Sequence, residues 1–122
     1  MIDMNTIRTL IPQAFTGVEL PDLGAKHSGK VRDYFLLDSR RVLVTTDRLS
    51  AFDRILTAVP YKGQVLNQLA AWWFDQMKDV VGNHIVAVPD PNVSIGAEAD
   101  PLPVEVIVRG FITGVTSTAL WT

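Results

Sequence analysis

Cationic side chains follow a glycine in the stretch Ser28-Gly29-Lys30-Val31-Arg32-Asp33. A glycine at a turn lets backbone N–H groups come close to a phosphate, because no Cβ stands in the way. Lys30 and Arg32 are two residues apart, so on a strand both side chains would lie on one face and could straddle a polyphosphate. The stretch is not a Walker loop, which needs a longer glycine-rich run before a helix. The alternative is an exposed hairpin tip without a ligand.

Polar side chains also follow the apolar run Val42–Val44, within residues 46–53 (TDRLSAFD). Residues just after a strand often carry function, because the strand holds the loop rigidly. Asp47 and Asp53 could orient cations or accept substrate N–H groups, and Ser50 could donate to a carboxylate. The alternative is that Asp47 or Ser50 only caps a short helical turn.

Two charged residues interrupt a strongly apolar stretch at 103–110 (PVEVIVRG). Glu105 and Arg109 are four residues apart, so on a strand both lie on one face. Burying an isolated charge is costly, so charges in such a strand need a partner. The stretch indicates either a ligand-lined face or an internal Glu–Arg ion pair.

Several kinds of chemistry are excluded by what the sequence lacks. There is no cysteine, which removes disulfides, thiolate nucleophiles and cysteine-ligated zinc or iron–sulfur clusters. His84 has no partner at a metal-binding spacing, and His27 is interpreted as an exposed side chain or a phosphate contact. No Ser-His-Asp order, His-x-x-x-His pair or Gly-x-Ser-x-Gly elbow occurs. We therefore expect neither a hydrolytic triad nor a metal site built from this chain.

The composition fits one globular domain of 122 residues, of which 48% are hydrophobic. A net charge of −2 argues against a nucleic-acid partner, and no apolar run is long enough to span a membrane. The lack of cysteine and of a secretory signal favours the cytoplasm. Residues 26–54 hold seven basic and four acidic side chains, whereas residues 63–108 hold one basic and six acidic ones. This uneven distribution favours a local anionic ligand.

The hydrophobic pattern predicts an α+β fold with a mostly antiparallel sheet of about five strands and one long helix. Residues 22–38 have the pattern of a hairpin that turns at Ser28-Gly29, and residues 41–46 that of a buried strand. The other predicted segments are a short helix or extended arm (4–10), a loop-rich stretch (47–63), a helix (64–78), a strand (84–88), an irregular connection with four prolines (89–103), a strand or strand pair (104–113) and the first turn of a second helix (116–121).

The helix predicted at 64–78 has the clearest pattern. Its apolar residues recur at helical spacing and should form one buried face, made of Leu66, Leu69, Ala70, Trp73 and Met77. Trp72 and Phe74 flank this face, which predicts burial on more than one side. The chain ends at Thr122 inside an apolar stretch without a helix stop signal, so we expect it to be cut from a longer polypeptide.

Together these stretches resemble the phosphoribosylaminoimidazole-succinocarboxamide synthase (SAICAR synthase) family of purine biosynthesis. The matching stretches begin at about Gly24 and are, in order, Gly29-Lys30-Val31-Arg32-Asp33, residues 46–53, Lys62-Gly63 with the helix that follows, and residues 103–110. The resemblance implies an ATP-dependent ligase that joins L-aspartate to carboxyaminoimidazole ribotide through an acyl phosphate, giving SAICAR, ADP and phosphate. It also implies a two-lobed, kinase-like α+β fold, in which residues 1–122 form the N-terminal, ATP-binding lobe.

The resemblance further implies roles for individual residues. The implied ATP-binding residues are Gly29, Lys30, Val31 and Arg32 at the phosphates, with Leu102 and Glu105 near the adenine, whose edge the backbone of 100–103 would read. The implied substrate-binding residues are Asp47, Ser50, Asp53, Arg109 and Thr116, with Arg109 at the phosphate of the ribotide. Magnesium would be held by carboxylates of a C-terminal lobe, so no metal ligand is expected in this chain.

The sequence departs from the family pattern in two places. Val115 follows Thr113-Gly114 where members often have a serine, so Thr116 or Ser117 could take over that contact. The Asp-x-Lys-x-Glu segment of the C-terminal lobe is absent, so we expect these residues alone to lack ligase activity. The alternatives are a stand-alone nucleotide-binding module, another kinase-like ATP-dependent ligase or phosphotransferase, and an inert fragment.

Overall fold

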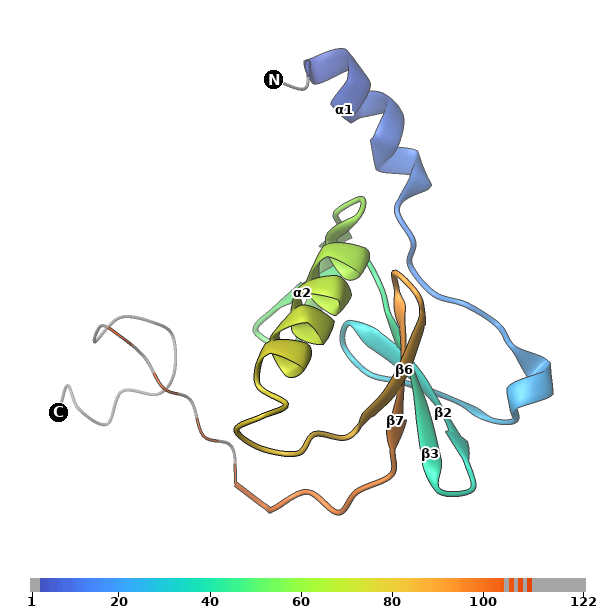
Figure 1. Ribbon diagram of the computed structural model, residues 1–122. Coiled ribbons are helices and arrows are strands. Elements are labelled where there is room, and N and C mark those ends of the chain that lie inside the picture. Colours follow the sequence, from blue (N-terminus) through green and yellow to red (C-terminus); the bar gives the residue numbers. More distant parts are fainter. Residues whose placement is uncertain (1–2, 105, 107, 109, 111–122) are drawn as a thin grey trace, which may run out of the picture.

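A five-stranded antiparallel sheet forms the centre of the molecule (Figure 1). The computed structural model describes residues 3–104, 106, 108 and 110. In spatial order the strands are β1 (Lys26–Ser28), β2 (Arg32–Leu37), β3 (Arg40–Thr45), β7 (Val93–Ala97) and β6 (Ile85–Asp90). Each neighbouring pair is antiparallel, which confirms the predicted sheet.

One face of the sheet carries the hydrophobic core. The alternation of β2 and β3 places Phe35 opposite Val42 on this face, and both are buried together with Val44. Residues 14–23, which we call the N-terminal strap, cover the core and end in a 3-10 turn, η2 (Pro21–Leu23). The strap contributes the half-buried side chains of Phe15, Val18, Leu20 and Leu23. The core therefore consists of two layers, the sheet and an irregular segment.

The long helix α2 (Lys62–Gln76) packs on the other face of the sheet (Figure 1). Its buried residues are Gly63 and Asn67. The Asn67 side chain accepts a hydrogen bond from Ser94 Oγ at 2.7 Å and donates one to Pro91 O at 3.0 Å. A Cβ on Gly63 would lie only 2.5 Å from Thr45 O, so the helix can approach β3 this closely only with glycine at that position.

The predicted helix is confirmed, starting and ending two residues earlier than expected, but the prediction of its buried face is wrong. Leu69 is 50% exposed and Trp73 is 53% exposed, and Leu66, Trp72 and Met77 are exposed as well. The reason is that α2 meets polar strand ends, which a glycine and an asparagine fit better than an apolar stripe does. Within the described part of the chain, the apolar stripe of α2 therefore faces outward except at Ala70, which is half-buried.

Two predictions of irregular structure are also wrong. The stretch 47–63 contains a hairpin, β4 (Arg48–Ala51) and β5 (Arg54–Ala58), which forms a separate two-stranded sheet. The stretch 89–103 contains the end of β6 and all of β7. Pro89 is compatible with β6 because β6 is an edge strand, where proline removes no required ladder bond.

The N-terminal helix α1 (Met4–Leu10) confirms the short helix predicted there, and it stands away from the sheet (Figure 1). A 3-10 turn, η1 (Ile11–Gln13), follows it at Pro12. The predicted strand at 104–113 lies mostly outside the described residues, and Val104, Val106 and Val108 have no regular secondary structure. The helical turn predicted at 116–121 lies wholly outside them. No helix in the described ranges is long and apolar enough to cross a membrane.

Candidate functional site

The glycine turn joins β1 to β2, as the sequence predicted. Ser28 pairs with Asp33 at the end of the hairpin, and the Gly29 N–H donates to Arg32 O at 2.7 Å. Gly29 and Lys30 are exposed. Lys30 precedes β2 and Arg32 is its first residue, so the expectation that both lie on one strand is wrong. The turn presents Lys30 separately from Arg32.

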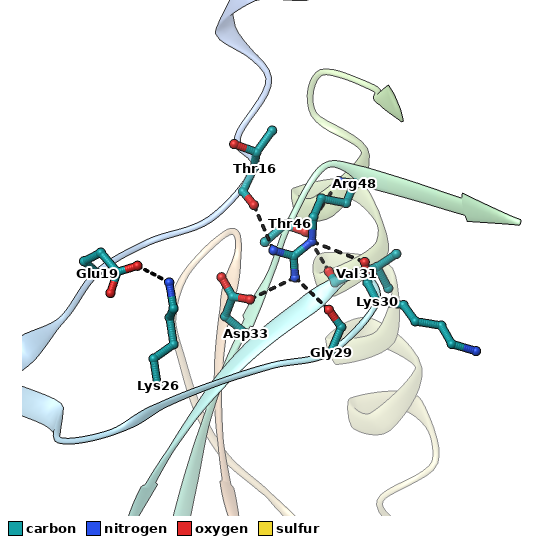
Figure 2. A network of polar contacts seen from close by, with 9 residues as sticks. All are labelled: Thr16, Glu19, Lys26, Gly29, Lys30, Val31, Asp33, Thr46 and Arg48. Carbon is teal, nitrogen blue, oxygen red and sulfur yellow. Dashed lines mark hydrogen bonds and ion pairs between the residues drawn. The ribbon is translucent and has the colours of Figure 1, made fainter. Parts of the chain in front are cut away.

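The guanidinium of Arg48, the first residue of β4, lies against the backbone of this turn (Figure 2). Its Nε donates to Lys30 O at 3.2 Å, and one Nη donates to Gly29 O at 3.1 Å. The other Nη donates to Thr16 O of the N-terminal strap at 2.9 Å. Arg48 therefore ties the turn to the strap through backbone carbonyls.

Asp33 completes the environment of Arg48 through a buried ion pair. Its Oδ1 lies 2.8 Å from the guanidinium, and the two side chains are 1% and 13% exposed. Desolvation acts to raise the pKa of Asp33, but hydrogen bonds from Arg48 and Ser28 and the charges of Arg48 and Lys26 outweigh it and lower the pKa. Asp33 Oδ2 is buried and has no hydrogen-bond partner among the described residues. The pair therefore stays charged in a nearly dry position.

Asp47 collects backbone N–H groups and is 3% exposed. Its Oδ2 accepts from Phe15 N at 2.9 Å and from Tyr61 N at 3.1 Å, and its Oδ1 accepts from Gly63 N at 2.7 Å. Tyr61 and Gly63 lie at the start of α2, so the carboxylate caps this helix from a distance. The capping alternative thus fits Asp47, although the capped helix is α2 and not a local turn.

Residues from two of the motifs meet at the open end of the turn. Lys30 Nζ forms an ion pair with the carboxylate of Asp53, at the tip of the β4–β5 hairpin. Both side chains are exposed. Phe52 and Asp53 have φ values of 49° and 62°, a left-handed pair that forms the tight turn between β4 and β5. Ser50 lies on β4 and is half-buried. Gly29, Lys30 and Asp53 are therefore brought together.

A second feature lies on the α2 side of the sheet, where a hollow of about 320 Å³ opens beside β7. Arg32 reaches it from β2 and Leu43 from β3, and Arg41 forms an ion pair with Glu98 at 2.5 Å. The hydrogen bonds that Arg41 donates to the Glu98 carboxylate raise the pKa of Arg41. The other lining residues are His84, Gly96, Ala97 and Ala99. The hollow borders the segment that leads to Leu102, which is 80% exposed.

Three predicted site residues, Glu105, Arg109 and Thr116, lie outside the described residues. Within the described ranges no group of three histidine, aspartate or glutamate side chains could hold a metal ion. The described residues therefore form a cationic turn, an acidic hairpin tip and a separate hollow.

Comparison with known proteins assigns the family. Residues 25–121 match the family model described as SAICAR synthetase. The chain belongs to this family. A SAICAR synthase of Legionella pneumophila (strain Lens) is 55% identical over 112 residues, which cover 92% of this chain and 36% of the relative. A chloroplastic SAICAR synthase of Vigna aconitifolia is 52% identical over 103 residues, covering 84% of this chain and 30% of the relative.

A solved structure confirms the fold. SAICAR synthase from Saccharomyces cerevisiae, complexed with SAICAR, matches with a TM-score of 0.73 and 31% identity, over 83% of this chain and 42% of that chain. The predicted α+β, kinase-like fold is thereby confirmed. The chain spans about a third of the length of the curated SAICAR synthases it matches.

Sequence reasoning missed the residues that hold the site together. Arg48 and Asp33 lie inside the motifs that carry the SAICAR synthase resemblance, but their residue types alone predicted no role for either side chain. The signal was their opposite charge beside apolar strands, where a charge needs a partner. Asn67 was missed as well, although an asparagine in the middle of a helix is unfavourable unless its side chain makes specific hydrogen bonds.

Proposed function

We propose that this chain is the ATP-binding lobe of a SAICAR synthase, which joins L-aspartate to carboxyaminoimidazole ribotide and forms SAICAR, ADP and phosphate. The observation that carries the proposal is the contact between two family motifs, the Gly29–Lys30 turn and the Asp53 hairpin tip, in a chain whose residues 25–121 match the family. ATP and a second substrate must meet for phosphoryl transfer to occur, and this contact brings an ATP-binding and a substrate-binding candidate together. A cytoplasmic location is part of the same proposal.

The ATP-binding part of the proposal uses the turn and the hollow. Lys30 is an exposed point charge beside an exposed glycine, which suits the phosphates. Arg32 lies at the other end, in the hollow next to β7, where it can reach the nucleotide from the sheet side. Val31 links the two, and Leu102 with Glu105 would lie toward the adenine. The described residues fit ATP through their cations and open backbone.

The substrate-binding part keeps Ser50, Asp53, Arg109 and Thr116. Arg109 would bind the phosphate of the ribotide, and Asp53 with Ser50 would line the region for L-aspartate. We remove Asp47 from this set, because both of its oxygens already accept backbone N–H groups in a buried position. The described residues do not by themselves form a magnesium site, so no step is derived through that ion.

The exposed stripe of α2 supports the proposal that a second lobe packs there. Leu66, Leu69 and Trp73 are each at least 43% exposed, and Trp72 beside them is 52% exposed. A contiguous apolar stripe on a monomer is typical of an interaction surface. In a two-lobed protein this stripe would be covered, and the 122 residues alone would lack ligase activity.

The test is an activity assay on the full-length gene product and on the 122-residue chain. The full-length protein should release ADP only when both L-aspartate and the ribotide are present, and SAICAR should appear in equal amount. Lys30→Ala should raise the KM for ATP, whereas the matched exposed variant Lys78→Ala should not. Nucleotide binding without SAICAR formation would favour the stand-alone binding module. ADP release by the short chain, dependent on both substrates, would contradict the two-lobe proposal.

A further inference from the structure

The backbone carbonyls of the β1–β2 turn are all held on one side. Gly29 O and Lys30 O accept hydrogen bonds from Arg48. Val31 O accepts from Thr46 twice, from the backbone N–H at 3.0 Å and from Oγ1 at 2.8 Å. Three consecutive carbonyls of an exposed turn are thus fixed by Thr46 and Arg48, which lie two residues apart in one segment.

This fixes the direction of the N–H groups as well. In a trans peptide the C=O and the N–H of one unit point to opposite sides. Because the carbonyls of Gly29 and Lys30 point toward Arg48, the N–H groups of Lys30 and Val31 point away from it. Neither Lys30 N nor Val31 N donates to an acceptor in the described part of the chain. Successive outward N–H groups form an anion-binding concavity.

The Lys30 side chain, which forms an exposed ion pair with Asp53, brings an ammonium group next to these N–H groups. Figure 2 shows it directed away from the Arg48 guanidinium, while its carbonyl points toward it. Arg48 itself is 13% exposed and its charge is paired with Asp33, so it does not offer the ligand a free cation. An arginine fits this place because its planar fork spans several carbonyls at once, which a lysine cannot do.

We propose that Arg48, held by Asp33, is a positioning residue that shapes the 29–32 backbone into a binding site for the polyphosphate of the nucleotide. This inference rests on the proposed function, because it assigns the anion to ATP. The inference goes beyond that function because it makes the selectivity for phosphates depend on Arg48, a residue that does not itself contact the phosphates. A merely structural Arg48 would stabilise the sheet without any preference for one ligand.

The experiment measures the Kd of ATP and of adenosine for the full-length protein by calorimetry, at a temperature where circular dichroism shows each variant folded. Arg48→Lys should weaken ATP by about tenfold, the equivalent of one net hydrogen bond, and leave adenosine unchanged. In the activity assay the KM for ATP should rise, while the KM for L-aspartate stays constant. Arg40→Lys, an exposed arginine on β3, is the matched control and should change nothing.

A second variant covers the case in which Arg48→Lys does not fold. Asp33→Asn keeps the size of the side chain but removes the charge that orients the guanidinium, and it should weaken ATP selectively by several-fold. Equal weakening of ATP and adenosine, or no weakening of either, would overturn the inference. If the wild type forms SAICAR and the variants bind ATP normally, only this inference fails. If the wild type binds no ATP, the proposed function fails with it.

Discussion

Replacing Asp47 with asparagine tests how the site is built. The carboxylate is 3% exposed and accepts three backbone N–H groups, at 2.9, 3.1 and 2.7 Å. The donors belong to the N-terminal strap (Phe15) and to the start of α2 (Tyr61 and Gly63). Asparagine has the same shape but only one acceptor oxygen, and its NH₂ group must face at least one of these N–H donors.

The expected loss of stability follows from these contacts. A hydrogen bond to a charged group contributes about 1.5–3 kcal/mol. The sum over the three bonds is an upper limit to the loss of stability, because the contributions of bonds to one carboxylate are not additive. If the amide oxygen keeps the two bonds at the Oδ2 position, the Gly63 N–H is left buried without a partner, which costs about 1–3 kcal/mol. Loss of the charge weakens the remaining two bonds. We expect Asp47→Asn to lower the free energy of unfolding by about 2–4 kcal/mol, a large share of the roughly 5–15 kcal/mol of a domain.

The assay is urea denaturation followed by tryptophan fluorescence, with Asp75→Asn as the control. Asp75 is 62% exposed, and among the described residues its side chain pairs only with Lys78, three residues further along the chain. Its replacement should change the free energy of unfolding by less than about 0.5 kcal/mol. If Asp47→Asn falls within the same range as Asp75→Asn, Asp47 does not tie α2 to the strap and the reasoning is refuted.

Three further predictions concern neighbouring positions. Asp33 has a pKa lowered below its ordinary 3.8. The stability that its charge contributes is therefore present above about pH 4 and is lost as the pH falls through the lowered pKa. In thermal unfolding, Asp33→Asn should be less stable than the wild type at pH 7, and this difference should shrink in acid. Gly63→Ala should lose about 1–3 kcal/mol in urea unfolding, because its Cβ would lie 2.5 Å from Thr45 O, whereas Gly82→Ala meets nothing within 4 Å and should lose nothing. Phe52→Asn should raise the stability by about 0.5–1 kcal/mol, because Phe52 has a φ of 49° that asparagine adopts more easily; a lower melting temperature would contradict this.

Local patterns were enough to predict the hairpin and the helix. In β2 the exposed Leu36 lies between the buried Phe35 and the half-buried Leu37, and the Val42–Val44 run identifies β3 as a strand with little access to water. These elements are decided by side chains within a few residues of one another. The helix α2 was predicted for the same reason, since its periodicity is local.

The other features of the fold depend on contacts between residues that are distant in the sequence. Whether the stripe of α2 is buried depends on which element lies against it, and the sheet meets Asn67 instead, through Ser94. β7 was missed because Ser94 and Gly96 interrupt its apolar pattern, yet both face α2 or the hollow and need no apolar side chain. Arg48 could be placed in a motif, but its carbonyl partners lie 18 to 32 residues away.

Asp47 and Arg48 show how two adjacent residues can hold three separate segments. Neighbouring residues of an extended chain project to opposite sides, so one collects N–H groups and the other collects carbonyls. Both reach the strap, where Asp47 accepts from Phe15 N and Arg48 donates to Thr16 O. Asp47 also holds the start of α2, and Arg48 the 29–30 turn. Because Asp47 holds the start of α2 and the adjacent Arg48 holds the 29–30 turn, a shift of α2 against the sheet would be transmitted through these two residues to the turn. The helix that would pack against a second lobe is therefore linked, through Asp47 and Arg48, to the backbone that would bind the phosphates.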